Sequence, residues 1–481
     1  MTETEAWALY LSGFKPTFVV LRDYDQRFHD QQIRISDLER QLVLAKKHPS
    51  TPSAMQAAFT KANRAAKPKK KRSRGRGVHR PPPDKVDETK EHALTCCPDC
   101  SNPLPPLSET RERFTEELPV VEPRVIRHLI HRYWCRVCKK IVEATVVDAL
   151  PKSTIGLRTV VYSAWLHYIL GVSFDKIIQL LNLSAHFQVS TGGLFGAWHH
   201  LARVLAPLYE QIGRSVKSSA VLHADETGWR VNGRTHWLWC FTNNVLAYFL
   251  IDRCRGSPVA LKVLGKYFAG VLVTDFLGAY GLICALAKQK CLVHLLREII
   301  RVNLFDSSPE WKAFRNQLKR LVLDGLQLGR RRADFEPACF ERRKALLKQR
   351  LVELYARPYS NKNADRLRKR LERHRNEIFT FLDYPSVTPD NNHAERQIRP
   401  AVVSRKTSYG NRSKEGADVQ AMLLSIFRTL ELRGYNPVNA LLFLLQEHLR
   451  TGKPMTLPPA LPLAFTPERT QSETASPVVV K

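Results

Sequence analysis

The sequence has no run of apolar residues near the length of about 20 that a membrane-spanning helix needs. Its first residues include Glu3 and Glu5 and have no basic stretch ahead of an apolar one, so we expect no secretory signal. Acidic residues are scarce as well, with 45 Asp and Glu against 75 Lys and Arg. These absences predict a cytoplasmic chain with no membrane partner.

The resulting net charge of +30 predicts a polyanionic partner, because neutralising a polyanion releases the counterions condensed on it. Charge by itself does not separate nucleic acid from an anionic membrane surface. The 481 residues suffice for about two to four domains, and a hydrophobic content of 44% is ordinary for a folded protein. Ten cysteines in a cytosolic chain favour metal ligands and buried thiols over disulfides.

Residues 1–50 are predicted to form a zipper-like helix. Heptad spacing places Leu21, Phe28, Ile35 and Leu42 at one seam position and Tyr24, Gln31, Leu38 and Ala45 at the other. The repeat favours a short coiled coil that pairs two chains, and a single amphipathic helix packed on its own domain is the alternative. Residues 51–92 follow as a disordered basic linker, because positions 61–80 hold ten Lys or Arg and no acid. This linker is either a spacer or a nonspecific contact for phosphates.

Residues 93–150 are predicted to form a zinc-ribbon-like module. Two Cys-x2-Cys pairs present four thiolates in two turns, which suits one tetrahedral Zn²⁺. The pairs are Cys97 with Cys100 and Cys135 with Cys138. The other candidate ligands are Cys96, which competes with Cys97, and His92, His128 and His131. A structural Zn²⁺ would stabilise a module too small to fold on its own core. Free core thiols are the alternative.

Residues 151–217 have a helical pattern. The segment 174–181, a turn near Asn182 and the segment 192–198 are compatible with a helix-turn-helix that binds DNA. A plain helical bundle fits equally, so we assign no base contacts to this region.

Residues 218–305 change to a β-rich pattern followed by α-β units. We expect a strand ending at Asp225, strands over 237–242, 246–252, 271–275 and 290–293, and helices over 258–267 and from about 278 and 294. Asn243-Asn244 predicts a hairpin between two of these strands. A three-strand meander followed by α-β units is the layout of a ribonuclease-H-like α/β core. The predicted fold class is therefore multidomain α+β, with this core added to the N-terminal coiled-coil helix and the zinc module.

Residues 306–388 interrupt the core as a helical insertion. Leu346, Leu347, Leu351 and Leu354 mark one helix, and Leu367, Leu371, Ile378 and Leu382 mark another. Six of the ten residues 366–375 are basic, which indicates either a solvated helix face or a clamp on nucleic acid. Residues 389–450 return to the core through further helices, and residues 451–481 are expected to be a flexible tail.

Three carboxylates stand out by their positions. Asp225 and Asp275 each follow an apolar run and are expected at the ends of buried strands, and Glu395 lies where a helical pattern opens. Acids so placed can converge on a pair of divalent cations roughly 4 Å apart, which clamp the attacking and leaving oxygens of a phosphodiester. Glu226 competes with Asp225, and Asp390 competes with Glu395 although it could instead cap the helix.

Three motifs carry a resemblance to a known family. They are His223-Ala224-Asp225-Glu226-Thr227, Asp390-Asn391-Asn392-His393-Ala394-Glu395-Arg396, and Arg405-Lys406 before Ser408-Tyr409-Gly410. With the N-terminal helix and the cysteine pairs, nearly the whole chain resembles the DDE transposases of the IS66 insertion-sequence family. The resemblance implies that the three acids bind two Mg²⁺ (or Mn²⁺) ions and catalyse DNA cleavage and strand transfer. The chain departs from many relatives in Thr227-Gly228-Trp229, where they have Thr-Pro-Val, and in a linker without their Asn-Ser-Ser-Lys-Pro-Pro run.

The resemblance also implies partners. These are transposon ends and target DNA, bound at the bacterial nucleoid by a homo-oligomer, with possible small accessory transposition proteins. The basic residues expected to meet DNA near the acids are Arg396, Arg399, Arg405 and Lys406. Cys291-x2-His294 with Arg297 resembles a Cys-x2-His signature near the transposon end, so His294 and Arg297 are further DNA-binding candidates. A buried thiol beside a core histidine is the alternative for that signature.

Two other functions fit the same sequence. A catalytically silent DNA-binding regulator would keep the basic linker, the zinc module and the helical region, but retention of all three acids argues against it. A ribonuclease-H-fold repair nuclease would keep the acids and the core. Strand-transfer products distinguish a transposase from such a nuclease, which makes none.

Overall fold

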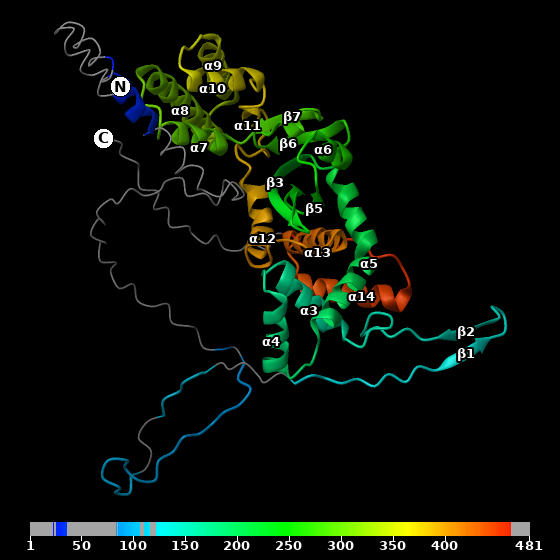
Figure 1. The fold of residues 1–481 in the computed structure, drawn as a ribbon. Coiled ribbons are helices and arrows are strands. Elements are labelled where there is room, and N and C mark those ends of the chain that lie inside the picture. The colour runs from blue at the N-terminus through cyan, green and yellow to red at the C-terminus, as the bar shows by residue number, and fades with distance from the viewer. Residues whose placement is uncertain are drawn as a thin grey trace, which may run out of the picture.

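The computed structural model describes residues 23, 26–35, 83, 85–105, 110–115 and 122–462, which form a mixed α/β chain of several parts (Figure 1). Residues 26–35 are helical, and Phe28 and Ile35 on this helix are exposed. The rest of the predicted zipper and most of the predicted basic linker lie outside the described residues. Within the described ranges no helix is long and apolar enough to cross a membrane.

A short hairpin precedes the main body of the chain. Strands β1 (Arg132–Cys135) and β2 (Lys140–Glu143) pair antiparallel, with Cys135 opposite Lys140. Figure 1 shows this hairpin extended away from the helices and the large sheet. Its side chains are almost all exposed, so the hairpin has no hydrophobic core of its own among the described residues.

Three helices follow the hairpin: α3 (Leu157–Tyr168), α4 (Phe174–Ala185) and α5 (Thr191–Val216). The Ser190 side chain accepts a hydrogen bond from the Gly193 amide and so caps the start of α5. Leu194, Trp198 and Leu201 recur at helical spacing and are completely buried. The Trp198 indole donates to the Ser163 hydroxyl on α3 at 3.0 Å. These contacts pack the helices predicted for residues 151–217 as a bundle.

The central sheet has five strands in the order β5-β4-β3-β6-β7. The strands are β3 (Val221–Val231), β4 (Arg234–Thr242), β5 (Ala247–Asp252), β6 (Tyr267–Thr274) and β7 (Cys284–Lys290). The first three are antiparallel neighbours, whereas β6 and β7 run parallel to β3. Helix α6 (Ser257–Leu264) connects β5 to β6. This confirms the predicted three-strand meander followed by α-β units, including the hairpin at Asn243-Asn244.

Three details of the predicted strand pattern are wrong. Asp225 lies in the middle of β3 and not at its end, because β3 pairs with β4 as far as Val231 and turns at Asn232-Gly233. Both turn residues have positive φ, as a tight hairpin requires, and the Asn-Gly pair was the signal for it. The expected helix near residue 278 is only a single 3₁₀ turn, Gly278–Tyr280. The last strand ends at Lys290 and does not run over 290–293, since helix α7 (Leu292–Val302) begins there.

The sheet separates two hydrophobic clusters. On β6, Leu272 belongs to the cluster shared with α3 to α6, whereas Val271 and Val273 belong to the cluster with α7 and the inserted helices. This division follows from strand geometry, because successive side chains point to opposite faces. The inserted helices are α8 (Pro309–Arg330), α9 (Pro337–Ala356), α10 (Lys362–Arg373) and α11 (Thr380–Asp383), with a 3₁₀ turn at Arg332–Asp334.

The chain then returns to the sheet through α12 (Asn392–Ser408), α13 (Lys414–Leu432) and α14 (Pro437–Thr451). Helix α13 covers the edge strand β5: the Ser425 and Thr429 hydroxyls accept hydrogen bonds from the amides of Phe249 and Ala247. An edge strand covered in this way cannot pair with another chain.

The predicted flexible tail does not hold for its first part. Met455 is buried, the Leu457 amide donates to the Gln211 side chain at 3.0 Å, and the Leu461 amide donates to the Arg433 carbonyl at 2.9 Å. Residues 452–462 are therefore fixed on α5 and α13. The remainder of the tail lies outside the described residues.

Candidate active site

Asp225 and Glu226 are neighbours on β3 and point to opposite faces of the sheet. The Glu226 carboxylate accepts hydrogen bonds from the Arg255 guanidinium at 3.0 Å and from the Tyr280 hydroxyl at 3.1 Å. Burial and the Asp275 carboxylate raise the pKa of Glu226 to about 7, against the opposing effect of Arg255. Glu226 therefore has partners of its own on its face of the sheet. Asp225 points the other way, and its Oδ1 accepts the Glu226 amide at 3.0 Å.

Asp275 directly follows β6, the strand parallel to β3. One oxygen of its carboxylate accepts a hydrogen bond from the Leu277 amide at 2.8 Å. Its backbone carbonyl accepts from the Thr274 hydroxyl at 2.9 Å and from the Lys290 ammonium at 3.0 Å. The backbone at Asp275 is thus fixed just beyond the end of the strand.

Glu395 lies in the first turn of α12 and is 93% buried, with 7% of its surface exposed. Its Oε1 has no hydrogen-bond partner within the described part of the chain, and His294 Nε2 and Arg297 Nη1 each lie 3.6 Å away. Burial lowers the pKa of His294, so Arg297 supplies the positive charge at neutral pH. Burial also raises the pKa of Glu395, although Arg297 opposes this.

Asp390, the rival of Glu395, has a local structural role. Its Oδ1 accepts the Asn392 amide at 3.0 Å at the start of α12, which satisfies one of the free amides of the first turn. This agrees with the alternative that Asp390 caps the helix.

Asn391 is a residue of the site that sequence reasoning missed. It is completely buried, and its Nδ2 donates to the Ala224 carbonyl at 2.8 Å. Its Oδ1 lies 3.2 Å from Nδ1 of His223, and its amide donates to the Cys291 thiol at 3.2 Å. Asn391 therefore joins β3, the start of α7 and the start of α12. Its place inside the Asp-Asn-Asn motif was the available signal.

The three acids influence one another. Burial raises the pKa of Asp225 well above its usual range, and the carboxylates of Glu226, Asp275 and Glu395 raise it further. Buried and half-buried carboxylates gathered in this way are stable as anions only near positive charge, which divalent cations supply. Together with Oε1 of Glu395, which accepts no hydrogen bond in the described part of the chain, this donor set fits hard cations such as Mg²⁺ or Mn²⁺. Among the residues described, no three His, Cys, Asp or Glu side chains already have the spacing of metal ligands.

The Cys291-x2-His294 segment lies beside Glu395. The Cys291 thiol is buried, and burial raises its pKa to about 12, so it stays protonated. Because the thiol accepts the Asn391 amide, its role is internal. His294 and Arg297 approach Glu395 from α7, as given above.

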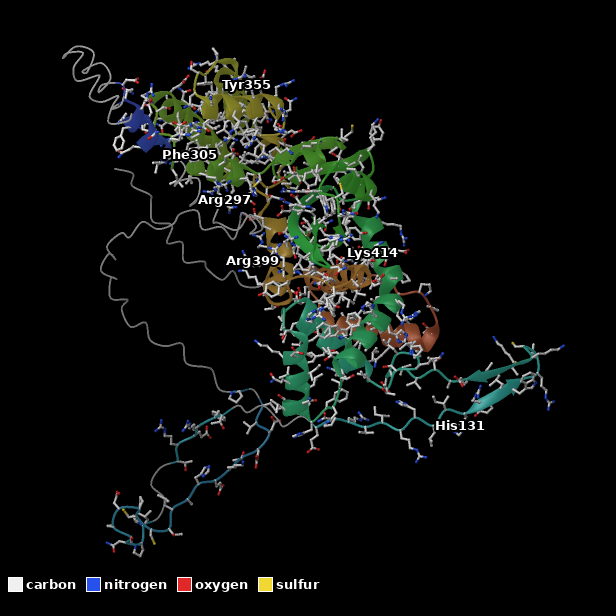
Figure 2. All side chains as sticks on the ribbon, in the orientation of Figure 1. His131, Arg297, Phe305, Tyr355, Arg399 and Lys414 are labelled. Atoms are coloured by element: carbon white, nitrogen blue, oxygen red, sulfur yellow. The ribbon has the colours of Figure 1, made fainter. Side chains whose placement is uncertain are left out.

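The basic residues predicted to contact DNA differ in their surroundings. Arg396, Arg399 and Lys406 are exposed on α12. Figure 2 shows Arg399 on the same flank of the molecule as Arg297, and both lower the pKa of Glu395. Arg405 is half-buried and donates to the Gly228 carbonyl and the Thr227 hydroxyl, so part of its donor capacity joins α12 to β3.

The basic stretch of the insertion is largely paired with acids. Arg366 and Arg370 bind Glu298 on α7, and Arg368 and Lys369 bind Asp365. These ion pairs favour a solvated and internally neutralised helix face for α10.

The two cysteine pairs each form a tight turn. The Cys97 amide donates to the Asn102 carbonyl at 2.9 Å, and Cys135 and Cys138 enclose the β1–β2 turn. Backbone amides of Asp99 and Cys100 lower the pKa of the Cys97 thiol, and the Cys138 amide does so for Cys135. Both turns therefore favour thiolates, the form that binds zinc. The two pairs do not meet in the described structure.

Comparison with known proteins identifies the family of the chain. The family model described as "Transposase IS66 family" matches residues 152–419, and the "zinc-finger binding domain of transposase IS66" matches residues 95–139. Two curated proteins of Sinorhizobium fredii are similar to the chain, both described as uncharacterized. Protein y4jD is 24% identical over 398 residues, 75% of each chain. Protein y4qI is 26% identical over 364 residues, 68% of this chain and 66% of its own. The family match covers more than half of the sequence and includes all three acids, so the chain belongs to the IS66 family of transposases.

Proposed function

We propose that this transposase uses Asp225, Asp275 and Glu395 as a DDE triad to cut the ends of its element and to join them to target DNA. Family membership implies transposition. The observation that carries the catalytic assignment is the placement of the three acids, and Asp275 and Glu395 both raise the pKa of Asp225. The acids come from two neighbouring parallel strands and from a helix joined to β3 by Asn391.

Two Mg²⁺ or Mn²⁺ ions held by the three acids would activate the attacking oxygen and stabilise the leaving oxygen. Arg297 balances the charge of Glu395, and Arg396, Arg399 and Lys406 provide exposed cations for the phosphates. A water attacks the phosphodiester at the transposon end, and the 3′-hydroxyl that is released attacks a target phosphodiester in line. One bond forms as another breaks at each step, so no covalent enzyme intermediate is required.

We extend the proposal to the parts of the chain. The sheet has the strand order β5-β4-β3-β6-β7, with Asp225 on β3 and Asp275 directly after β6. This arrangement supports a ribonuclease-H-like core over 218–305 and 389–450. Residues 306–388 form its helical insertion. Four segments precede the core. Residues 1–50 would pair two chains, and residues 51–92 would contact phosphates. Residues 93–150 would bind zinc, and residues 151–217 would bind DNA. The complex would act on DNA at the bacterial nucleoid as a homo-oligomer, with possible small accessory proteins.

The catalytic assignment is tested with Asp275→Asn. The variant should abolish Mg²⁺-dependent cleavage of DNA carrying the ends of the element, because the amide keeps the shape of the side chain but loses its charge. DNA binding, measured by gel shift, should stay largely intact. The matched control is Asp324→Asn, which removes a carboxylate paired with Arg350 on the insertion and should cleave like the parent. Cleavage by Asp275→Asn at the parental rate would end the assignment.

A donor-plus-target assay then separates transposition from simple hydrolysis. The parent protein should give joined donor and target strands in addition to cut ends. A protein that cuts both DNAs without joining them would be a nuclease on this fold.

A further inference from the structure

Lys290, the last residue of β7, lies next to the candidate active site but outside the triad. Only 2% of its surface is exposed. A lysine this deeply buried is stable only when its ammonium group has hydrogen-bond and charge partners. Its partners therefore indicate why a cation is present at this position.

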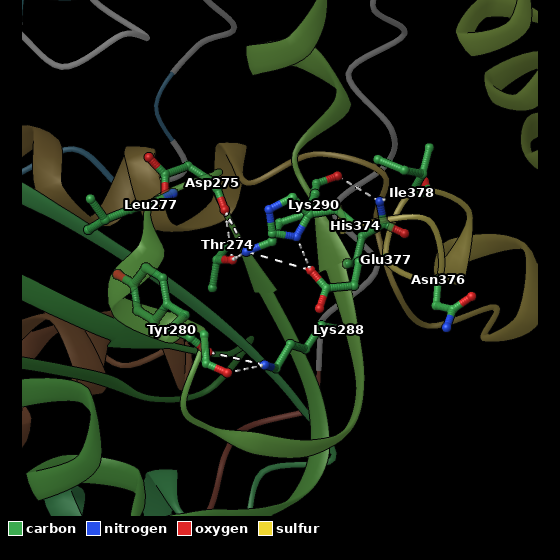
Figure 3. Close-up of polar contacts among 12 residues, drawn as sticks. Thr274, Asp275, Leu277, Tyr280, Lys288, Lys290, His374, Asn376, Glu377 and Ile378 are labelled. Atoms are coloured by element: carbon green, nitrogen blue, oxygen red, sulfur yellow. Dashed lines mark hydrogen bonds and ion pairs between the residues drawn. The ribbon is translucent and has the colours of Figure 1, made fainter. Parts of the chain in front are cut away.

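The Lys290 ammonium is directed at the backbone of the catalytic strand. Its Nζ donates to the Thr274 hydroxyl at 2.9 Å and to the Asp275 carbonyl at 3.0 Å (Figure 3). The parallel register places Lys290 opposite Thr274, so the side chain reaches the residue just beyond it. Lys290 thus holds the peptide that carries the Asp275 carboxylate.

The third partner of Lys290 comes from the insertion. Glu377 follows α10, and its Oε2 lies 3.9 Å from Nζ of Lys290 and 2.7 Å from Nδ1 of His374. The Glu377 carbonyl also accepts the Lys290 amide at 2.7 Å. The end of the inserted helices is therefore anchored to the last residue of β7.

A second contact links the insertion to the other side of Asp275. The ring of Phe276 meets the edge of His374 at a centroid distance of 5.6 Å. The Arg370 guanidinium lies 5.3 Å from the same ring, while it also binds Glu298 on α7. The segment 370–377 thus contacts Phe276 directly, and it reaches Thr274 and the Asp275 carbonyl through Lys290.

Resting on the proposed function, we propose that Lys290 and Glu377 are positioning residues through which the helical insertion sets the place of the Asp275 carboxylate. Asp275 lies beyond the end of β6, where strand pairing no longer fixes the backbone. A metal-binding carboxylate has to be held within about 0.5 Å of its productive position, so an added support is required there. The insertion provides this support through one buried cation.

The test uses Lys290→Met, alone and combined with Glu377→Met, in the full-length protein. Lys290→Met should lower the turnover rate for end cleavage by about ten- to hundredfold, because small misplacements of a catalytic group have effects of this size. The KM for DNA should stay the same. The double variant removes both charges and should recover the thermal stability of the parent, since an apolar pair can replace a buried ion pair. It should not recover cleavage, because the hydrogen bond to the Asp275 carbonyl is still missing.

Lys288→Met is the matched control on the same strand. The Lys288 ammonium donates to the carbonyls of Tyr280 and Gly281 and not to that of Asp275, so this variant should cleave like the parent. Cleavage by the double variant at the parental rate would mean that the pair is only structural and would overturn the proposal.

A readout that does not depend on catalysis decides the proposal in every case. Hydrogen exchange of the Phe276 and Leu277 amides, in buffer free of Mg²⁺, should be faster in Lys290→Met and in the double variant than in the parent. Unchanged exchange overturns the positioning role even if the proposed function stands. Conversely, equal cleavage by the parent and by Asp275→Asn would remove the proposed function, whereas faster exchange would still show that Lys290 holds this backbone.

Discussion

Single residues determine how the strand of Asp225 meets the helix of Glu395. The Asn391 side chain donates to the Ala224 carbonyl, and its carbonyl oxygen accepts the Nδ1 proton of His223. Burial lowers the pKa of His223 to about 4, so this ring is neutral at physiological pH. The Glu395 amide in turn donates to the Asn391 backbone carbonyl at 3.2 Å. One buried amide side chain therefore orients both elements that carry these candidate acids.

Asn391→Ala should destabilise the protein by about 2–4 kcal/mol, because it leaves buried groups of Ala224 and His223 without partners. The free energy of unfolding is measured by urea denaturation. The control is Asn392→Ala at the next position, where no side-chain hydrogen bond is found among the described residues, with an expected change within about 0.5 kcal/mol. Equal losses in the two variants would contradict the role given to Asn391.

The sequence singles out the three candidate acids but not the residues that hold them. Asp225, Asp275 and Glu395 occur in motifs or after apolar runs, so local signals identify them. Asn391 lies inside the Asp-Asn-Asn motif, but the motif does not show what its side chain binds, and Lys290 has ordinary surroundings in the sequence. Their roles depend on contacts with His223 and Thr274, which only the tertiary fold brings close. The sequence also does not decide whether Asp225 or Glu226 is the better candidate for a metal ligand. The contacts of Glu226 with Arg255 and Tyr280 favour Asp225.

At the scale of elements, the contact between β3 and β6 brings Asp225 and Asp275 onto neighbouring strands. This contact depends on Gly270, which lies between Phe268 and Val271, where the pairing of β6 with β7 on its other side is irregular. A Cβ atom at Gly270 would lie 2.1 Å from the Ser219 carbonyl oxygen and 2.8 Å from that of Ala220. Since both are backbone atoms, no side-chain rotation can relieve the overlap.

Gly270→Ala should therefore destabilise the protein by about 1–3 kcal/mol or more and lower end cleavage, because β6 has to move away from β3. Thermal unfolding and cleavage rate are the measurements. Gly196→Ala on α5 is the control, since a Cβ there meets nothing within 4 Å and should stabilise the helix by about 0.5–1 kcal/mol. A neutral Gly270→Ala would show that the two strands have room to separate.

The order of the elements could be predicted better than their ends. Periodicity and turn residues gave the meander, the α-β units and the inserted helices. The end of β3 was missed although Asn232-Gly233 is a hairpin signal, because the extra strand residues Thr227-Gly228-Trp229 are irregular in pattern. The start of β7 was missed because Cys284 to Ala287 alternate exposed and half-buried residues, and polar residues follow them, so the strand has no strong apolar run.

At the scale of the whole molecule, the zinc-finger module and the main body of the chain, which begins at about Leu150, differ in what stabilises them. None of the buried hydrophobic residues in the described ranges precedes Leu150. In the β1–β2 hairpin, Trp134 is 63% exposed and Val137 is 91% exposed. The body, in contrast, has two hydrophobic clusters on either side of the sheet. A module without a core depends on metal binding for its folding energy, so zinc should matter for the module and not for the body.

Cys135→Ser combined with Cys138→Ser should therefore remove bound zinc and weaken DNA binding, while the main thermal unfolding transition stays at the parental temperature. Zinc content is measured by atomic emission, DNA affinity by fluorescence anisotropy, and unfolding by calorimetry. Cys284→Ser, an exposed thiol on β7, is the control and should keep zinc and DNA affinity. Comparing Cys96→Ser with Cys97→Ser then identifies the ligand of the first pair, because only the true ligand's loss should lower zinc content. Retention of zinc by the Cys135/Cys138 variant would mean that other residues bind the ion. A lower temperature of the main unfolding transition would show that the module stabilises the body.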